Sequence, residues 1–384
     1  MTNTTYDVLV LGLGGMGSAT LYHLASRGLR VCGVEQFGVS HDRGSSHGAA
    51  RVIRKAYLEH PDYVPLLQRA YTLWEDLERA AGKSLFVKSG LLLTGPEGSH
   101  TIDGLHTCYR THDLPHRVLS AAAAMDEFPQ FRLPTDNVCF HDPDGGYLFV
   151  EDCVEAHLRA AEAAGAEVRL HEQVDSWHAD GDEVVLETSK GTLRAKKLVI
   201  TAGPWSGPIL AQAGVHLDVI RKVQLWYSTP EIEQFRSPAF PTWFIENDQG
   251  VFYGIPAIGD WGIKVAQHTG GQIVVDPDEI DRGLQYEDEE PVLTLLADLF
   301  PTLKPKRTHF SVCMYTMTPD EHFILDLHPE FDHVVIGCGF SGHGFKFASV
   351  VGEILADLAV DGATQHPIDF LRLKRLLPAS IGRG

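Results

Sequence analysis

One segment near the N-terminus, Tyr6 to Glu35, limits the possible folds of this chain most. It opens with a short apolar run, YDVLVLG, and continues with a stretch of helical periodicity from Gly14 to Arg27. A second apolar run, LRVCGVE, ends at Glu35. Two buried strands joined by a helix predict a β-α-β unit in a parallel sheet, with a right-handed crossover. We therefore expect an α/β protein organised around this unit.

The turn between the first strand and the helix has the spacing Gly12-x-Gly14-x-x-Gly17. The first glycine permits a tight turn, the second lets the backbone approach a pyrophosphate, and the third allows close packing of the helix. Glu35 follows Gly17 by 18 residues, at the end of the second strand, where a carboxylate accepts hydrogen bonds from a ribose. Together these features predict a dinucleotide site, and the acid favours FAD or NAD over NADP.

Charge and hydropathy exclude some classes of binding partner and indicate where in the cell the protein is located. The 384 residues carry a formal net charge of −19, which argues against nucleic acid because phosphate backbones bind basic faces. No apolar run reaches the roughly eighteen residues of a transmembrane helix, so no membrane association is expected. The N-terminus lacks a signal-peptide pattern, and the terminal Ile-Gly-Arg-Gly384 is not a peroxisomal tripeptide. These features predict a cytoplasmic protein.

The cysteines and histidines show no metal-ligand spacing. The 6 cysteines are scattered without a C-x-x-C pair, and the 20 histidines form no H-E-x-x-H motif. Scattered cysteines in a large chain without a secretion signal are typical of reduced thiols. We expect neither a disulfide framework nor a metal.

Later segments repeat the pattern of a strand followed by glycine. Residues 196–201 and 333–337 are apolar runs of this kind, and a helical stretch follows from Phe345 to about Leu358. Strand-like segments lie between them, at 91–94, 183–188, 223–227, 251–256 and 263–268. This order predicts a nucleotide-binding domain made of three separate segments, with a largely antiparallel sheet domain inserted twice.

The segment from Arg43 to Tyr57 combines small residues with His47, Arg51 and Arg54, and suits a loop that covers a cofactor. On a helical turn, the two arginines would point in neighbouring directions. One interpretation is a solvated basic face. The other is a partly buried segment, favoured by the apolar residues between the arginines, in which each guanidinium needs an anionic partner.

Three further residues each allow two interpretations. Lys264 alternates with apolar residues and shares a strand face with His268, which is either an outward polar face or a functional one. Lys346 follows four glycines at a helix start that favours anions, and its head either reaches solvent or serves a ligand. Cys313 is either a small buried apolar residue or a thiolate that bonds to a cofactor ring.

The chain resembles the monomeric sarcosine oxidase family, which also includes N-methyltryptophan oxidase and L-pipecolate oxidase, from Asp7 to about Leu373. Six motifs in the same order carry this resemblance. They are Gly12-x-Gly14-x-x-Gly17, Gly44-Ser-Ser-His47-Gly, Arg51-x-Ile-Arg54-Lys-Ala-Tyr57, Cys313-Met-Tyr315-Thr, Pro319-Asp-Glu-x-Phe-Ile-x-Asp326 and Gly339-Phe-Ser-Gly-His-Gly-Phe-Lys346.

The resemblance implies an α/β (α+β) fold, in which a Rossmann-like FAD-binding domain carries an inserted, mainly antiparallel substrate domain. We expect residues 1–88, 146–220 and 312–384 in the FAD-binding domain, and residues 89–145 and 221–311 in the substrate domain. The family also implies roles for particular residues. FAD is expected to be bonded through its 8α-methyl carbon to Cys313, and Arg54 with Lys346 to bind the substrate carboxylate.

The remaining roles follow the same resemblance. Lys264 is expected to hold a water near flavin N5 and promote the reaction with dioxygen, with His268, Tyr253 and Tyr315 as further catalytic residues. Arg51 is expected to be catalytic as well, and both Arg51 and His47 are expected near the flavin ring. Further cofactor contacts are expected from Gly12, Gly14, Gly17, Glu35, Ser45, Gly342, Gly344 and Lys346.

The implied activity is that of an oxidase of secondary α-amino acids, such as sarcosine or L-pipecolate. Hydride transfer to flavin N5 would leave an imine that hydrolyses, and dioxygen would become hydrogen peroxide. The alternatives are a dehydrogenase that uses another electron acceptor, and a flavin-binding protein without turnover. The expected partners are the small amino acid and dioxygen, and the protein is expected to be a monomer.

The chain also departs from these relatives. Sarcosine oxidases typically carry His-His-Gly-Asp-Thr before the first arginine, whereas this chain has Ser46-His-Gly-Ala-Ala50. The segment Arg54-Lys-Ala-Tyr-Leu-Glu59 is closer to that of pipecolate oxidase. The segment Arg221-Lys-Val-Gln-Leu-Trp226-Tyr resembles that of the N-methyltryptophan branch. The motifs therefore leave the substrate open.

Overall fold

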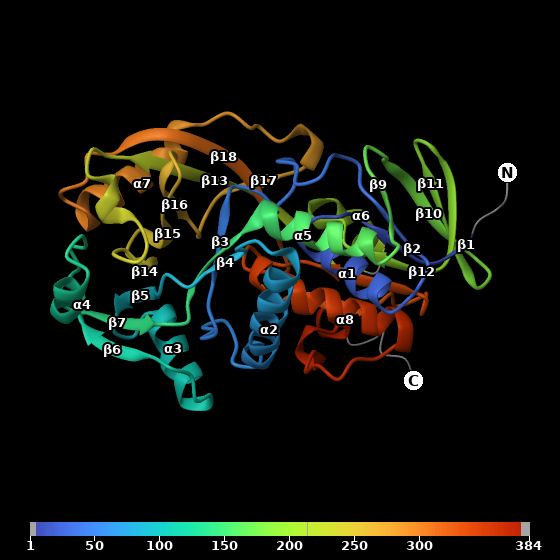
Figure 1. Cartoon of the computed structure of the whole chain (residues 1–384), viewed down its shortest axis with the longest axis horizontal. Coiled ribbons are helices and arrows are strands. Elements are labelled where there is room, and N and C mark those ends of the chain that lie inside the picture. The colour runs from blue at the N-terminus through green and yellow to red at the C-terminus, as the bar shows by residue number, and fades with distance from the viewer. Residues whose placement is uncertain (1–4, 213, 378–384) are drawn as a thin grey trace.

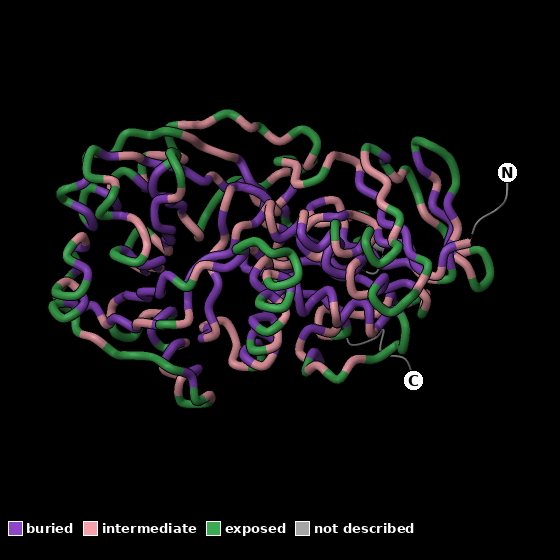
Figure 2. Tube along the Cα trace, viewed as in Figure 1, coloured by how far each residue is buried: buried purple, intermediate pink, exposed green. Residues whose placement is uncertain are grey.

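The computed structural model describes residues 5–212 and 214–377. These residues form an elongated molecule, with an eight-stranded sheet at one end and a nine-stranded sheet at the other (Figure 1). A three-stranded sheet and several helices lie between them (Figure 1). Buried backbone runs through the middle of the molecule, and exposed backbone is concentrated in the outer loops (Figure 2).

The eight-stranded sheet contains the predicted β-α-β unit. Its order is β10-β11-β12-β1-β2-β9, with β20 against β12 and β19 beside β20. Strand β1 is parallel to both β2 and β12, and β12 is parallel to β20. The strands are β1 (Thr5–Leu11), β2 (Val31–Val34), β9 (Glu167–Arg169), β10 (Val174–Asp180), β11 (Glu183–Thr188), β12 (Gly191–Ile200), β19 (Ile324–Leu327) and β20 (Val334–Cys338).

Helices α1 (Gly15–Ser26), α2 (Tyr63–Ala81), α5 (Val150–Ala163) and α8 (Ala348–Asp361) pack together beside this sheet (Figure 1). Helix α1 touches both α5 and α8. A Cβ added at Gly352 would lie 2.5 Å from the carbonyl carbon of Ala19, so the glycine sets how closely α8 approaches α1. Apolar residues from all four helices and from β1 belong to one buried cluster, which fixes the orientation of the α1 N-terminus.

The nine-stranded sheet has the order β17-β13-β16-β15-β14-β5-β7-β6, and β18 pairs with β13. Its neighbours are antiparallel except β5 and β14. The strands are β5 (Leu91–Pro96), β6 (Arg117–Ser120), β7 (Asn137–Asp142), β13 (Asp218–Ser228), β14 (Thr242–Asn247), β15 (Gly250–Ile258), β16 (Gly262–Gln267), β17 (Gln272–Val274) and β18 (Lys306–Met317). Helices α3 (His100–Thr111), α4 (Ala121–Glu127) and α7 (Tyr286–Leu299) accompany it.

The small sheet joins the two ends. It contains β3 (Ala50–Ile53), β8 (Gly146–Phe149) and β4 (Phe86–Val87), in the order β3-β8-β4. Arg51 therefore lies on a strand and Arg54 directly after it, so the two arginines do not share a helical turn. The β-branched residues Val52 and Ile53 between the arginines favour the strand.

Short helices complete the described residues. They are α6 (Gly207–Gln212) and the 3₁₀ turns η1 (Gly203–Ser206), η2 (Ile232–Phe235), η3 (Pro277–Glu279), η4 (Phe345–Phe347), η5 (Asp369–Leu371) and η6 (Leu373–Leu376). The helix predicted from Phe345 is therefore a 3₁₀ turn followed by α8. No helix in residues 5–212 and 214–377 is long and apolar enough to cross a membrane.

The fold class predicted from sequence is confirmed, and each predicted strand corresponds to an observed one. The predicted domain boundaries after residues 220 and 311 fall inside β13 and β18. Both strands continue through these points without a break in pairing. The division into two domains remains a prediction.

Candidate active site

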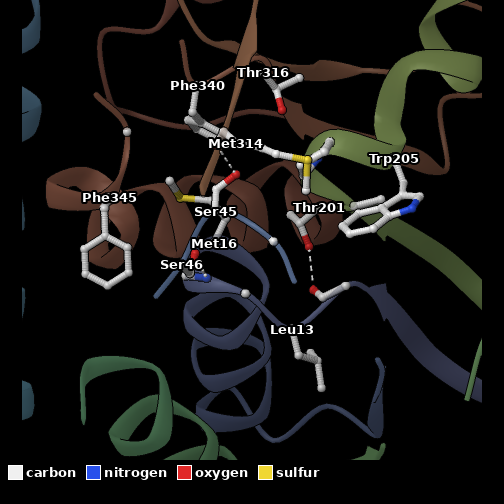
Figure 3. A pocket seen from close by; sticks show the side chains of 18 of the residues that line it. Leu13, Met16, Ser45, Ser46, Thr201, Trp205, Met314, Thr316, Phe340 and Phe345 are labelled. Carbon is white, nitrogen blue, oxygen red and sulfur yellow. Dashed lines mark hydrogen bonds between the residues drawn. The ribbon is translucent and has the colours of Figure 1, made fainter. Parts of the chain in front are cut away.

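A cavity of about 580 Å³ runs from the N-terminal end of α1 to the faces of β15 and β18. We call it the central cavity. Figure 3 shows Leu13 and Met16 at the start of α1, Thr201 and Trp205 after β12, and Met314 and Thr316 on β18 around it. Its lining thus comes from both large sheets and from the loop before β3.

The α1 end of the central cavity is shaped by glycine. Gly12 has φ +87°, and an added Cβ would lie 2.7 Å from the Thr201 carbonyl oxygen. An added Cβ at Gly17 would overlap the Gly12 carbonyl oxygen, so helix and strand could not stay this close. Gly14 faces the cavity, and its nearest obstacle is Ser46 Oγ at 3.4 Å. The backbone here can therefore contact a ligand directly.

Glu35 lines the same end and is held by backbone donors. Leu13 N–H donates to Oε2 at 2.9 Å, and Phe37 N–H donates to Oε1 at 3.0 Å. Burial alone would raise the pKa of Glu35, but the contacts with His41 and with these two amides lower it below its ordinary value. The carboxylate is therefore ionised and fixed, with lone pairs left to accept from a ligand hydroxyl.

The loop before β3 connects the two ends of the central cavity. Ser46 Oγ accepts the Gly15 N–H at 3.0 Å, which caps α1. Ser45 donates from Oγ to the Met314 carbonyl at 2.7 Å (Figure 3). The loop is thereby fastened to the β-α-β unit and to β18.

Cys313 is buried, lines the central cavity and lies beside a guanidinium. Arg51 Nη2 is 3.5 Å from Cys313 Sγ and 3.1 Å from the Ser45 carbonyl oxygen. Arg51 Nη1 donates to Gln224 Oε1 at 3.0 Å. The guanidinium is therefore held in place directly beside the sulfur by its other two acceptors.

Arg54 is 3% exposed, and its partner is Glu59. Its Nη2 donates to both carboxylate oxygens, at 2.9 and 3.1 Å. Its Nη1 is buried without a hydrogen-bond partner among the described residues. Burial would raise the pKa of Glu59, but Arg54, His343 and Lys346 lower it to about 2. The solvated basic face is therefore wrong, and one buried donor of Arg54 is available to a ligand.

Lys346 and this guanidinium both lie over the Tyr57 ring. The Arg54 guanidinium carbon is 4.8 Å from the ring centroid, and Lys346 Nζ is 5.2 Å from it. Lys346 is 6% exposed, and Nζ donates to the His343 carbonyl at 2.8 Å, so its head does not reach solvent. Burial and the neighbouring Arg54 lower the pKa of Lys346 to about 7. An anion placed between these two groups would stabilise both charges.

Lys264 is 1% exposed, so the outward polar face is wrong. Its Nζ donates to the carbonyls of Gly48 and Ala50, each at 2.7 Å, and lies 5.2 Å from the Trp226 ring centroid. Burial and Arg51 lower the pKa of Lys264 well below its ordinary value. The side chain lies behind the cavity wall, against the loop that carries the sequence departure at Ala49 and Ala50.

The other predicted catalytic residues meet at the far end of the central cavity. His268 Nδ1 is 3.2 Å from the Tyr315 hydroxyl, and both residues line the cavity with Tyr253. His268 follows β16 directly, so the predicted strand ends one residue earlier than expected. A Cβ on Gly342 would overlap the Tyr315 ring, which makes this glycine a packing requirement. Gly344 also lines the cavity.

His47 and Gly17 lie behind the wall of the central cavity. His47 Nε2 is 3.1 Å from the Gly44 carbonyl oxygen, and Nδ1 is 3.1 Å from Ser311 Oγ. Burial, with Arg51 and Lys264 nearby, lowers the pKa of His47 to about 3. The neutral ring therefore braces the loop.

Comparison with known proteins gives the family. The FAD dependent oxidoreductase model matches residues 7–358. A monomeric sarcosine oxidase of Streptomyces avermitilis is 40% identical over 380 residues, covering 98% of this chain and 99% of that protein. This chain belongs to the monomeric sarcosine oxidase family of FAD-dependent oxidoreductases.

Other members of the family extend the comparison. The human peroxisomal sarcosine oxidase is 36% identical, with 98% of this chain and 97% of that protein covered. An N-methyl-L-tryptophan oxidase of Citrobacter koseri is 35% identical, with 96% and 99% covered. Among solved structures, the open form of the amino acid oxidase NikD has a TM-score of 0.84 at 28% identity, covering 96% of this chain and 97% of that one.

The central cavity of this FAD-dependent oxidoreductase fits a dinucleotide. Gly14, the start of α1 and the Glu35 carboxylate suit a pyrophosphate and a ribose, and Trp205 with Ile209 gives an apolar wall. Two buried polar atoms that line it, Thr316 Oγ1 and Arg54 Nη1, have no partner in the described part of the chain. Unpartnered polar atoms in a cavity indicate that a bound group completes their hydrogen bonds.

Several residues of the site were not predicted. Glu59 stands five positions after its partner Arg54, and the need for an anionic partner was a usable signal. Glu151 accepts the Gly48 N–H at 2.7 Å from 103 positions away, and Gln224 binds Arg51 from 173 positions away. Phe244 lies on β14, and the centroid of its ring is 5.4 Å from the Arg54 guanidinium carbon. Only the fold brings these three to the site.

Proposed function

We propose that this protein is an FAD-dependent oxidase of secondary α-amino acids. One observation carries the proposal. Arg54 Nη1, buried and unpartnered, faces a cavity that Lys346 also lines and that continues to the dinucleotide end. Two buried cations at the far end of a flavin site suit a substrate that carries a carboxylate.

The chain's residues would bind and orient the substrate. Arg54 and Lys346 would hold the carboxylate by charge-assisted hydrogen bonds, each contributing about 1.5–3 kcal/mol. The buried Tyr57 ring contacts both cations and keeps them in place. The amine and the α-carbon would then lie toward Tyr253, His268 and Tyr315. Such positioning supplies much of the catalysis in a reaction that needs one geometry.

FAD would be held by Gly12, Gly14, Glu35, the Ser45 loop and the turn containing Gly342 and Gly344. When bound, it would take a hydride from a carbon bonded to the amine nitrogen and deliver the electrons to dioxygen, so that the amino acid becomes a hydrolysable imine and hydrogen peroxide forms. We further propose that Cys313 is the covalent tether, because its Sγ lines the cavity beside Arg51.

Lys264 is proposed to serve the reaction with dioxygen. An ammonium has three donors, and the Gly48 and Ala50 carbonyls use two of them. The third can hold a water, and the fixed positive charge stabilises negative charge that develops on oxygen. Sarcosine, L-pipecolate and N-methyltryptophan remain the candidate substrates, and a cytoplasmic monomer remains the proposed state.

Anaerobic mixing with a panel of N-methyl and cyclic amino acids tests the proposal. We expect at least one member to bleach the flavin, and peroxide to form when air is admitted. Bleaching without peroxide would instead favour a dehydrogenase, and no bleaching by any member would contradict the proposal. Flavin that stays with acid-precipitated protein would support the Cys313 tether, and colourless protein would exclude it.

A further inference from the structure

Lys222 is a buried cation that the proposed mechanism does not use. It lies on β13, directly across from Cys313 in the pairing of β13 with β18, and is 6% exposed. Its Nζ donates to the carbonyl oxygens of Thr269 and Gly270, at 2.7 and 2.6 Å. Burial lowers the pKa of Lys222 to about 8.

The contacts of Lys222 converge on one pair of cavity residues. Thr269 and Gly270 directly follow His268, so the ammonium holds the backbone that carries this imidazole. The same Nζ lies 5.3 Å from the centroid of the Tyr315 ring. Tyr315 and His268 in turn meet at 3.2 Å, between the hydroxyl and Nδ1. The Lys222 ammonium therefore contacts the Tyr315 ring and also the backbone that follows His268.

We propose that Lys222 is a positioning residue that fixes the Tyr315–His268 pair and keeps the His268 imidazole neutral at the substrate end of the central cavity. The proposal deepens the proposed function, since this pair lines the end at which the amine would lie. Lys222 itself acts from behind the wall and does not touch the substrate.

The charges around His268 give the direction of the effect. Burial lowers the pKa of His268 to about 3, and Lys222, His343 and Lys346 lower it in the same direction, whereas Glu59 opposes them. These groups come from β13, from the turn before α8 and from the loop after β3, and Tyr315 of β18 supplies the neutral hydroxyl. Removing the Lys222 charge therefore raises the pKa of His268, while burial, the largest cause, still holds it below its ordinary value of about 6.5.

Protonation would alter the pair itself. A neutral imidazole can accept or donate at Nδ1, but an imidazolium only donates. A protonated His268 would also add a positive charge beside the amine of the substrate. The fraction of enzyme with a neutral His268 should then decrease at acidic pH, and the acid limb of flavin reduction should move to higher pH.

Three substitutions separate charge from hydrogen bonding. Lys222→Met removes both, Lys222→Gln keeps amide donors for the carbonyls without the charge, and Lys222→Arg keeps both. Lys196→Met, which removes an exposed lysine paired with Asp7, is the matched control. Each holoenzyme is titrated by NMR of histidine-labelled protein, with the His268 signal assigned from a His268→Asn variant. The pH dependence of anaerobic flavin reduction is measured in parallel.

We expect the His268 signal to titrate at higher pH in Lys222→Met and Lys222→Gln than in wild type. The acid limb of reduction should move with it, and Lys222→Arg and Lys196→Met should match wild type. Unchanged titration in Lys222→Gln would overturn the proposal, even if thermal stability decreases. If Lys222→Met does not fold, the Gln and Arg variants still decide. If no amino acid reduces the wild-type flavin, the proposed function fails, and the NMR titration alone then decides the role of Lys222.

Discussion

The two ends of the central cavity are made in different ways. The dinucleotide end comes mostly from one continuous segment, with Gly12, Gly14, Gly17 and Glu35 within 24 positions of one another. It is built largely from backbone groups and from glycines, which have no side chain. The substrate end brings together Arg54, Lys264 and His268 from distant parts of the chain, and its key groups are buried and charged. The first end depends on local backbone geometry, and the second depends on the completed fold.

This difference predicts which changes remove the cofactor and which leave it bound. Changes at the dinucleotide end should abolish FAD binding and destabilise the protein. Changes at the substrate end should leave the flavin in place and alter individual kinetic steps.

The largest effect is expected from Gly17→Ala. The added Cβ would overlap the Gly12 carbonyl oxygen, so α1 must move away from β1 and the pyrophosphate contacts are lost. We expect purified protein without FAD and a loss of stability of about 1–3 kcal/mol or more. Flavin absorbance and chemical denaturation measure both. Gly207→Ala is the matched control, because an added Cβ there meets nothing within 4 Å, and it should behave as wild type.

Lys264→Met should have the next largest effect, on a single step. Without the fixed charge, reoxidation of the reduced flavin by dioxygen should slow by about 100-fold or more. Amine binding and flavin content should change little, because Lys264 lies behind the cavity wall. Stopped-flow mixing of reduced enzyme with oxygenated buffer gives the rate. An unaltered oxidative half-reaction would exclude the role proposed for this lysine.

Arg54→Met should weaken substrate binding and spare the cofactor. Loss of one charge-assisted hydrogen bond, about 1.5–3 kcal/mol, corresponds to about a 10- to 150-fold increase in Kd. Anaerobic titration of flavin reduction gives this constant. The Kd of Arg54→Lys should lie between those of wild type and Arg54→Met, because lysine keeps the charge and loses the forked geometry. A variant that loses FAD would break the distinction between the two ends.

The smallest expected effect is that acid destabilises the protein through two buried histidines, one of them at the substrate end. Burial lowers the pKa of His23, beside α8, and of His343, at the substrate end, to about 4 in each case. The unfolded chain therefore binds protons at these sites below pH about 6.5, where the folded state does not, so stability decreases as pH falls from about 6.5 to 4. Urea unfolding at pH 7.5 and 5.0 measures the change. His23→Gln should reduce the loss without altering catalysis, and an equal loss in that variant would contradict the assignment.

The sequence was sufficient for the parts of the molecule that depend on local pattern. The β-α-β unit, its glycines and Glu35 follow from spacing within about 30 residues, and the strands at 183–188 and 263–268 follow from alternation. The three-residue spacing of Arg51 and Arg54 would fit a helical turn, whereas pairing of β3 with β8 decides the conformation. Propensity is a weak guide where a tertiary partner is available.

The spacing of residues in the sequence did not show which charged side chains are buried. Lys264, Lys222 and Lys346 each look like ordinary surface lysines, yet each is buried. Backbone carbonyls from other segments accept hydrogen bonds from Lys264 and Lys222, and the nearby His343 carbonyl accepts one from Lys346. The resemblance to known oxidases supplied roles for two of them, but the partners of these lysines appear only in the fold. Glu151 and Gln224 carried no local signal, since each acts on the loop around Ala49 from more than 100 positions away.

The most direct test of the account compares amines with and without a carboxylate. Wild-type enzyme is mixed anaerobically with sarcosine and dimethylamine, with L-pipecolate and piperidine, and with N-methyltryptophan and N-methyltryptamine, while flavin absorbance is followed. The account predicts saturable bleaching by at least one amino acid, and bleaching by its decarboxylated counterpart that is at least about 100-fold less efficient. Equal bleaching by both members of each pair, or bleaching by neither, would contradict it.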